Sequence, residues 1–205
     1  ITSRLVGSEM CIRDRTQTVM GYSTMKRDHT HYAGQIGGLG GKNTNDLAKE
    51  TDLAIAVGTK LADFTTGSWA NFENEKFKLI SVNVSRFDAN KHLAQAVVGD
   101  AKVSLIELSK ALGDWKLGDE WNEKSQRELK IWNEHIDKES APTNQEVPSY
   151  VQVIGAIYRN SEATDIAVTA AGGLVGEVVQ VWRPKELNTH AVSYTHLRAH
   201  ETTCD

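Results

Sequence analysis

The stretch Thr44 to Gly58, TNDLAKETDLAIAVG, decides the fold class of this 205-residue chain. Its first eight residues predict a short helix, and Asn43 or Thr44 is the expected cap of the first turn. Residues 53–57 (LAIAV) then form an apolar run that ends at a glycine, a pattern typical of a buried strand. A helix followed directly by a buried strand is the repeating unit of α/β proteins.

The same alternation continues downstream. Residues 77–84 predict a second strand, and a short segment at 89–93 leads to a third strand at 96–98. Residues 103–112 predict a helix that stops at Gly113. Its apolar positions indicate a broad buried face: Val103, Leu105, Ile106, Leu108 and Leu112. Short buried strands separated by helices imply a parallel sheet that is covered on both faces.

From residue 114 the composition becomes polar and charged, with three tryptophans interspersed. Residues 119–138 predict an amphipathic helix. The residues of its stripe are interpreted as packing positions: Trp121, Ser125, Leu129, Trp132 and Ile136. Residues 140–147 indicate a linker. A helix from Pro148 to Arg159, with the proline in its first turn, and a buried strand at 165–170 then begin a new unit.

Two glycine-rich runs have different interpretations. Ala171 to Glu177 (AGGLVGE) lies between a strand and a helix that continues through Trp182, which favours a phosphate cradle because glycine lets the backbone approach and the helix N-terminus presents free N–H groups. A simple tight turn remains the alternative. Gly34 to Lys42 (GQIGGLGGK) lacks the spacing of a P-loop and of the dinucleotide fingerprint, so it is interpreted as a flexible surface turn.

Charge and cysteine content narrow the class of protein. The formal net charge of −4 gives no broad positive field, so nucleic acid and anionic membranes are not expected partners. The apolar runs are far shorter than the roughly 20 residues of a membrane-spanning helix. Cys11 and Cys204 lie near opposite ends of the chain, which fits a reducing cytoplasm.

Both ends of the chain differ from the residues beside them. The opening SRLVGSEMCIRDR and the closing VSYTHLRAHETTCD resemble translated sequencing-adapter bases, so residues 1–15 and 191–205 are interpreted as non-native. In a helix, His196, His200 and Cys204 would share one face and offer ligand types that zinc accepts. The adapter interpretation argues against that site, and we predict no metal-binding residue.

Two parts of the chain carry a family resemblance. DLAIAVGTKLADFTTGSW (52–69) and LISVNVSRFDANKH (79–92) closely resemble the central domain of the thiamine-diphosphate-dependent trihydroxycyclohexanedione hydrolases of inositol catabolism. DIAVTAAGGLVGEV (165–178) resembles the start of the diphosphate-binding domain of the same enzymes. The resemblance spans about 18–190, and its specific part is Asp63 to Trp69, since the wider strand–helix pattern is shared with acetolactate synthases and related decarboxylases.

The resemblance implies an internal fragment of α/β class. A Rossmann-like parallel-sheet central domain (16–113) and a helical linker (114–147) would precede a truncated α/β diphosphate-binding domain (148–190). The implied parent is a cytoplasmic homo-oligomer that uses thiamine diphosphate (thiamine pyrophosphate) and magnesium to cleave a carbon–carbon bond of a cyclic diketone by hydrolysis. In this chain the backbone at four consecutive positions would lie against the cofactor diphosphate: Gly172, Gly173, Leu174 and Val175.

No catalytic residue is assigned to this chain. The family's activating glutamate belongs to an N-terminal domain, and its Gly-Asp-Gly motif for magnesium does not occur in this sequence. The chain alone is therefore expected to be inactive and to bind the cofactor weakly or not at all. Lys60 and Asp63 are expected at surface or interdomain positions, and His29, His31 and His92 are expected to be ordinary polar residues.

Two other functions stay open. One is a stand-alone Rossmann-like module that binds a nucleotide or a partner without catalysis, and the other is a fragment of an acetolactate-synthase-like carboligase. A half-built second domain also predicts unpaired edges on the strand at 165–170 and an exposed apolar side on the helix at 148–159.

Overall fold

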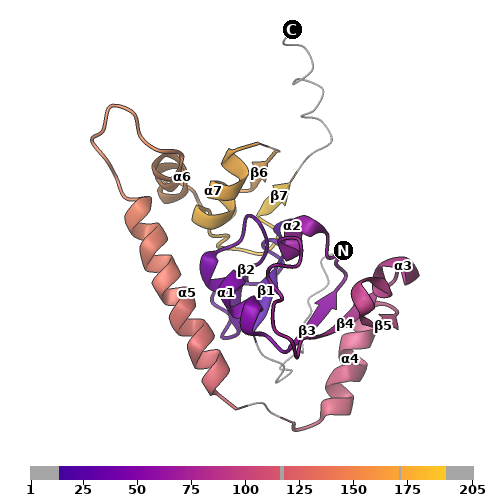
Figure 1. Cartoon of the computed structure of the whole chain (residues 1–205). Helices are drawn as coiled ribbons and strands as arrows, with labels where there is room; N and C mark the ends of the chain where they lie inside the picture. Colours follow the sequence, from indigo (N-terminus) through magenta and orange to yellow (C-terminus); the bar gives the residue numbers. More distant parts are fainter. Residues whose placement is uncertain (1–13, 116–117, 171, 193–205) are drawn as a thin grey trace.

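A computed structural model describes residues 14–115, 118–170 and 172–192 (Figure 1). The possible zinc ligands His196, His200 and Cys204 lie outside the described residues, as does most of each end that the sequence marks as non-native. Within the described part, no helix is both long and apolar enough to cross a membrane.

The N-terminal part begins with two parallel strands and a helix. β1 (Arg15–Gln17) pairs with β2 (Tyr32–Gln35), the 3-10 helix η1 (Val19–Gly21) lies between them, and α1 (Lys42–Glu50) follows. The predicted helix is confirmed, but its predicted cap is wrong, because Gly41 is the N-cap and makes no side-chain cap. Asn43 Nδ2 and Thr44 Oγ1 instead donate to the Ala33 carbonyl at 3.1 and 2.8 Å, which ties α1 to β2.

A three-stranded parallel sheet follows. β3 (Leu53–Val57), β4 (Lys78–Asn83) and β5 (Gln95–Val98) pair in that order, and their parallel pairing confirms the predicted parallel sheet. The helices and turns between and after them are α2 (Asp63–Thr66), α3 (Arg86–Ala89), the 3-10 helix η2 (Lys91–Leu93) and α4 (Ala101–Leu112). Gly113 is the C-cap of α4, which confirms the predicted stop. The fold is α/β with parallel sheets.

Fewer residues of this sheet and its helix are buried than predicted. Only Ala56 of β3 is buried, and Leu53 is exposed. α4 contains no buried residue, and the side chains of Val103 and Ile106 are 58% and 45% exposed, so the predicted face is wrong at these two positions. The described part of the chain therefore buries this helix less completely than predicted, because much of the predicted apolar face of α4 stays exposed.

The run from Gly34 to Lys42 is not a flexible surface turn. Residues 34–37 are buried, and the backbone of Gly37 is held at both its N–H and its carbonyl by the Asn45 amide at 3.0 Å. A Cβ at Gly37 would lie 2.5 Å from the Phe64 carbonyl oxygen, and a Cβ at Gly40 would lie 2.3 Å from the Gln35 carbonyl oxygen. The glycines serve close backbone packing rather than mobility.

A long helix leads to the C-terminal part. α5 (Glu120–Glu139) runs along one side of the molecule (Figure 1), and its predicted stripe is confirmed, with Ser125, Leu129 and Ile136 buried. α6 (Tyr150–Arg159) ends where predicted, but Ser149 is its N-cap in a capping box with Gln152, so Pro148 lies before the helix rather than in its first turn.

The C-terminal unit is small. β6 (Ala167–Thr169) pairs in parallel with β7 (His190–Val192), with α7 (Leu174–Val181) between them. β6 is therefore paired along one edge, so the expectation of unpaired edges is wrong at that edge. It is less buried than predicted, because only Thr169 is buried and Val168 is 66% exposed. The exposed apolar side predicted for α6 is confirmed: Tyr150, Val153 and Ile157.

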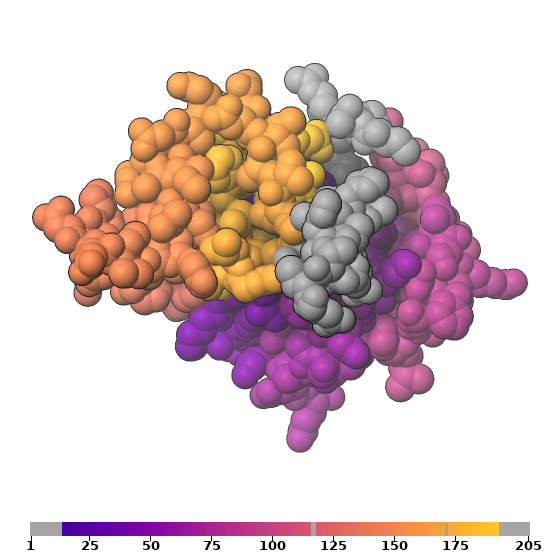
Figure 2. All heavy atoms as spheres, turned by 90° about the horizontal axis from the view of Figure 1, so that it is seen from above, coloured from indigo at the N-terminus to yellow at the C-terminus, as the bar shows by residue number. Residues whose placement is uncertain are grey.

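The N-terminal and C-terminal parts are packed against each other. The Tyr22 hydroxyl donates to the Trp182 carbonyl at 2.7 Å, and the Asn188 and His190 N–H groups donate to the Ser23 carbonyl and hydroxyl at 3.0 and 3.2 Å. Ile136, Ile154 and Val181 form an apolar cluster that joins α5, α6 and α7. Figure 2 shows the residues of α6 to β7 gathered on one side of the face and those of β4 to α4 on the other.

Candidate cofactor-binding site

The four predicted cofactor-binding residues lie together where β6 leads into α7. Gly172 has φ +126°, Gly173 is the N-cap of α7, and both are exposed. A Cβ at either glycine would meet no atom within 4 Å, so the backbone faces open space. Leu174 is half exposed, whereas Val175 is buried and anchors the first turn. Ala171 lies outside the described residues.

This turn offers backbone donors. The first N–H groups of a helix have no partner within the helix, and the helix dipole favours negative charge at that end. α7 has no side-chain cap, so no N-cap side chain occupies these donors. The backbone of 172–175 therefore fits the oxygens of a phosphate group.

The side chains around the turn do not add positive charge. Glu177 lies in the first turn of α7, and its Oε2 is buried without a hydrogen-bond partner among the described residues. Its carboxylate opposes an anion at the same helix end. Arg183, at the other end of α7, is already paired with Asp137 at 2.7 Å. The described residues contain no group of three or more His, Cys, Asp or Glu side chains that could hold a metal ion. The turn thus fits the diphosphate but not its magnesium.

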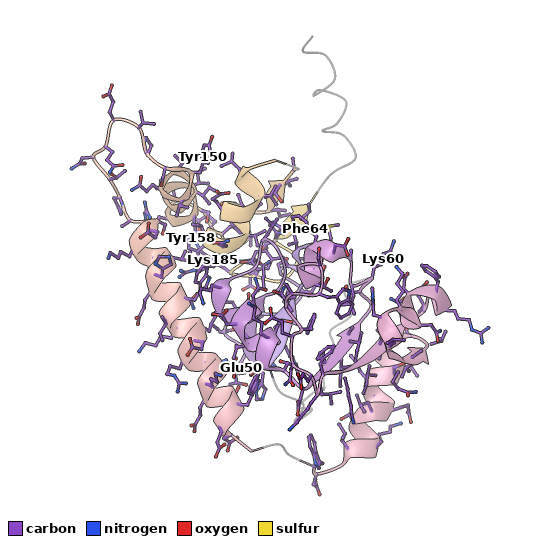
Figure 3. All side chains as sticks on the ribbon, in the orientation of Figure 1. Glu50, Lys60, Phe64, Tyr150, Tyr158 and Lys185 are labelled. Carbon is purple, nitrogen blue, oxygen red and sulfur yellow. The ribbon has the colours of Figure 1, made fainter. Side chains whose placement is uncertain are left out.

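The second candidate position is the carboxyl end of β3, where ligands of open parallel sheets bind. Gly58 (φ +64°) closes the strand, and the Asn83 amide donates to the Thr59 carbonyl at 3.2 Å. Lys60 and Asp63 are both exposed, as predicted for surface positions, and Lys60 lies between α2 and α3 in Figure 3. Neither residue lines the cavity between β2, α1, α5 and α7 or the hollow beside α6.

The contact between Trp69 and His92 was not predicted from the sequence. Their rings lie 4.5 Å apart and join the loop after α2 to η2. Ser68, Trp69, His92 and Leu93 all have positive φ, between 53° and 71°, which is uncommon for residues with a side chain. No spacing rule signals such a pair, because the contact depends on how two loops meet at the end of the sheet.

Asp88 lies beside the same two loops. Hydrogen bonds from Lys91 and Ser85 hold the pKa of its carboxyl below the usual range, and the charge of Lys60 acts in the same direction. The Lys91 ammonium is 3.1 Å from the carboxylate and 4.7 Å from the Phe87 ring centroid. This pairing fixes α3 and η2 rather than leaving a carboxylate free for acid–base chemistry.

The remaining predicted polar residues are arranged as ordinary polar contacts. The backbone N–H of His31 donates to His29 Nδ1 at 3.1 Å, and His31 Nδ1 lies 3.0 Å from the side-chain amide of Asn122. Partial burial lowers the pKa of His29, and the charge of Arg15 adds to this effect. In these contacts the partners of the two imidazoles are a backbone N–H group and an amide side chain, as in ordinary polar residues.

Comparison with known proteins supports the fold and the resemblance. Residues 14–108 match the family model of the thiamine pyrophosphate enzyme central domain. The chain is also similar to proteins named 3D-(3,5/4)-trihydroxycyclohexane-1,2-dione hydrolase. That of Geobacillus thermodenitrificans is 32% identical over 199 residues, that of Clostridium tetani 30% over 204, and that of Bacillus anthracis 29% over 202. Each match covers 87% of this chain and 31% of the relative.

The parallel α/β fold and the family match define the class. Residues 14–108 are a thiamine pyrophosphate enzyme central domain. Over 87% of its length the chain is related to trihydroxycyclohexanedione hydrolases at about 30% identity, and it spans about a third of the length of these curated relatives.

Proposed function

We propose that this chain is part of a thiamine-diphosphate-dependent enzyme that hydrolyses a carbon–carbon bond of trihydroxycyclohexanedione in the catabolism of myo-inositol. The observation that carries the proposal is the similarity to the named hydrolases, which continues past the central domain into the β6–α7 unit. The Asp63 to Trp69 segment, on which the resemblance is most specific, forms α2 and the left-handed turn after it.

The role of this chain in the reaction would be to hold and orient the cofactor. When bound, the cofactor supplies an electron sink for the carbon–carbon cleavage. The N–H groups at 172–175 would bind the oxygens of its diphosphate, and buried Val175 would fix the position of that turn. The central domain would support this turn through the contacts of Tyr22 and Ser23 with residues 182–190.

The isolated chain is proposed to be inactive. The described residues offer one backbone cradle, no acidic cluster for magnesium, and Glu177 where the anion would bind. Calorimetric titration of the chain with thiamine diphosphate and Mg²⁺ should therefore give no binding in the micromolar range. Gly172→Leu, which would fill the open space over the cradle, is the matched variant. If the unmodified chain bound the cofactor with micromolar affinity and Gly172→Leu abolished that binding, the chain would contain a working cofactor site. That result would contradict the proposal.

The complete protein decides between the hydrolase and the carboligase. Sequencing the source DNA across both sides of this reading frame is expected to reveal the Gly-Asp-Gly motif downstream of residue 190. The protein expressed from that frame, with cofactor and Mg²⁺, should consume trihydroxycyclohexanedione and release an acid. Condensation of pyruvate without consumption of the diketone would instead establish the acetolactate-synthase-like alternative.

The complete protein is further proposed to be a cytoplasmic homo-oligomer. The side chains of Val103 and Ile106 on α4 leave an apolar surface that the described chain does not cover, which supports the presence of further protein there. Sedimentation of the complete protein should show at least a dimer. A monomer that retains full activity would contradict this arrangement.

A further inference from the structure

A small cavity with both polar and apolar walls lies where the N-terminal and C-terminal parts meet. Its walls come from β2, α1, α5 and α7 and from the loop after η1. The volume open to the centre of a water molecule is about 20 Å³, and a cavity needs roughly 10–15 Å³ by this measure to hold one water. The space therefore suits a single water and no larger ligand.

Two buried side-chain amides in the wall each have one atom without a hydrogen-bond partner among the described residues. Gln35 is 5% exposed and its Nε2 has no hydrogen-bond acceptor among the described residues; Asn43 is 6% exposed and its Oδ1 has no donor. Turning the Asn43 amide over would not resolve this, because its Nδ2 already donates to the Ala33 carbonyl at 3.1 Å. A buried polar atom left without a partner costs about 1–3 kcal/mol, so each atom needs one.

The other walls of the cavity include two tyrosines and an arginine. Tyr22 and Tyr32 are buried, and Arg27 is half buried. The Arg27 guanidinium is 5.6 Å from the Tyr32 ring centroid and donates to the Asn133 side chain on α5. Burial raises the pKa of Tyr22 far above its ordinary value, so its hydroxyl stays protonated and bonded to the Trp182 carbonyl.

We propose that this cavity binds one ordered water molecule, which accepts a hydrogen bond from Gln35 Nε2 and donates one to Asn43 Oδ1. One molecule satisfies both orphan atoms because water is both acceptor and donor. The water links β2 to α1 beneath Val179 and Gln180 of α7, so the site is complete only while α7 is packed on the N-terminal part.

A crystal structure of the full chain at a resolution that shows ordered waters tests the proposal. A density peak within hydrogen-bond distance of both Gln35 Nε2 and Asn43 Oδ1 is the expected result. An empty cavity, or a direct hydrogen bond between the two amides, would overturn it. In solution, cross-relaxation in ¹⁵N-labelled chain should show a long-lived water beside the Gln35 side-chain amide, and its absence would also count against the site.

Gln35→Met is the matched variant, since it keeps the length of the side chain and removes the donor. The water peak and the cross-relaxation signal should both disappear, and the urea midpoint should fall. Gln145→Met, at an exposed position, should leave all three unchanged. If Gln35→Met does not fold, the two measurements on the unmodified chain still decide the question. A water that persists in Gln35→Met would refute the assigned donor.

Discussion

Gly37→Ala should be among the most damaging single-methyl additions to this chain. The added Cβ would lie 2.5 Å from the Phe64 carbonyl oxygen and 3.0 Å from the Thr65 Cα, and both are backbone atoms. Gly37 cannot shift easily, since the Asn45 side chain binds its N–H and its carbonyl at 3.0 Å. Its φ of +110° adds strain for any residue with a side chain.

The expected loss follows from these two effects. A residue held in a sparsely populated backbone region costs about 1–3 kcal/mol, and overpacking in a well-packed interior costs about 1–3 kcal/mol. Together they give about 2–6 kcal/mol, a large part of the roughly 5–15 kcal/mol that stabilises a typical domain. Urea unfolding followed by tryptophan fluorescence measures the loss.

Gly172→Ala is the control for the backbone effect alone. Gly172 has a similar φ of +126°, but a Cβ there would meet no atom within 4 Å. We therefore expect Gly37→Ala to lose more free energy of unfolding than Gly172→Ala by the overpacking cost, about 1–3 kcal/mol. Equal losses in the two variants would refute the close approach of residue 37 to α2.

Three further outcomes are expected. Tyr22→Phe should cost about 1–3 kcal/mol by leaving the buried Trp182 carbonyl without its donor, whereas exposed Tyr150→Phe should change the urea midpoint little. Burial lowers the pKa of His190, so as the pH falls the unfolded chain takes up the proton before the folded chain does. The stability that is present above about pH 6.5 should therefore fall as the pH is lowered. His190→Gln should make the urea midpoint depend less on pH between about pH 7.5 and 5.5. Ser149→Ala should cost about 1 kcal/mol and speed hydrogen exchange in the first turn of α6; unchanged exchange would show that the capping box contributes nothing.

The sequence predicted the elements better than their environments. The helix–strand unit at 44–58 and the stop at Gly113 were predictable because apolar spacing and glycine act locally. The burial of residues 34–37 was not predictable, because a run of glycines can form either a mobile loop or a close backbone contact. The contact here is made with the backbone of Phe64, which is distant in the sequence. The exposure of Val103 likewise depends on what packs against α4, which its own spacing does not contain.

The candidate site also has features that the sequence predicted and features that it did not. The strand, glycine turn and helix around Gly172 were predictable because they form one continuous segment of chain, and the binding of phosphate there stays a prediction. The Trp69–His92 contact and the bond from Tyr22 to the Trp182 carbonyl join residues far apart in the sequence, and no periodic pattern marks them. Sequence therefore predicts local turns and helix starts well and misses contacts made between separate loops.

The position of α5 sets where chimeras between relatives can be joined. Although its sequence looks like a linker, Gln126 donates to the Tyr32 carbonyl at 3.0 Å and Lys124 is paired with Glu50 on α1, labelled in Figure 3. A crossover at residue 113 would give the first parallel strands a foreign helix and mismatch those contacts. A junction placed after Glu139 would let α5 travel with its own central domain, and it should yield the more soluble hybrid.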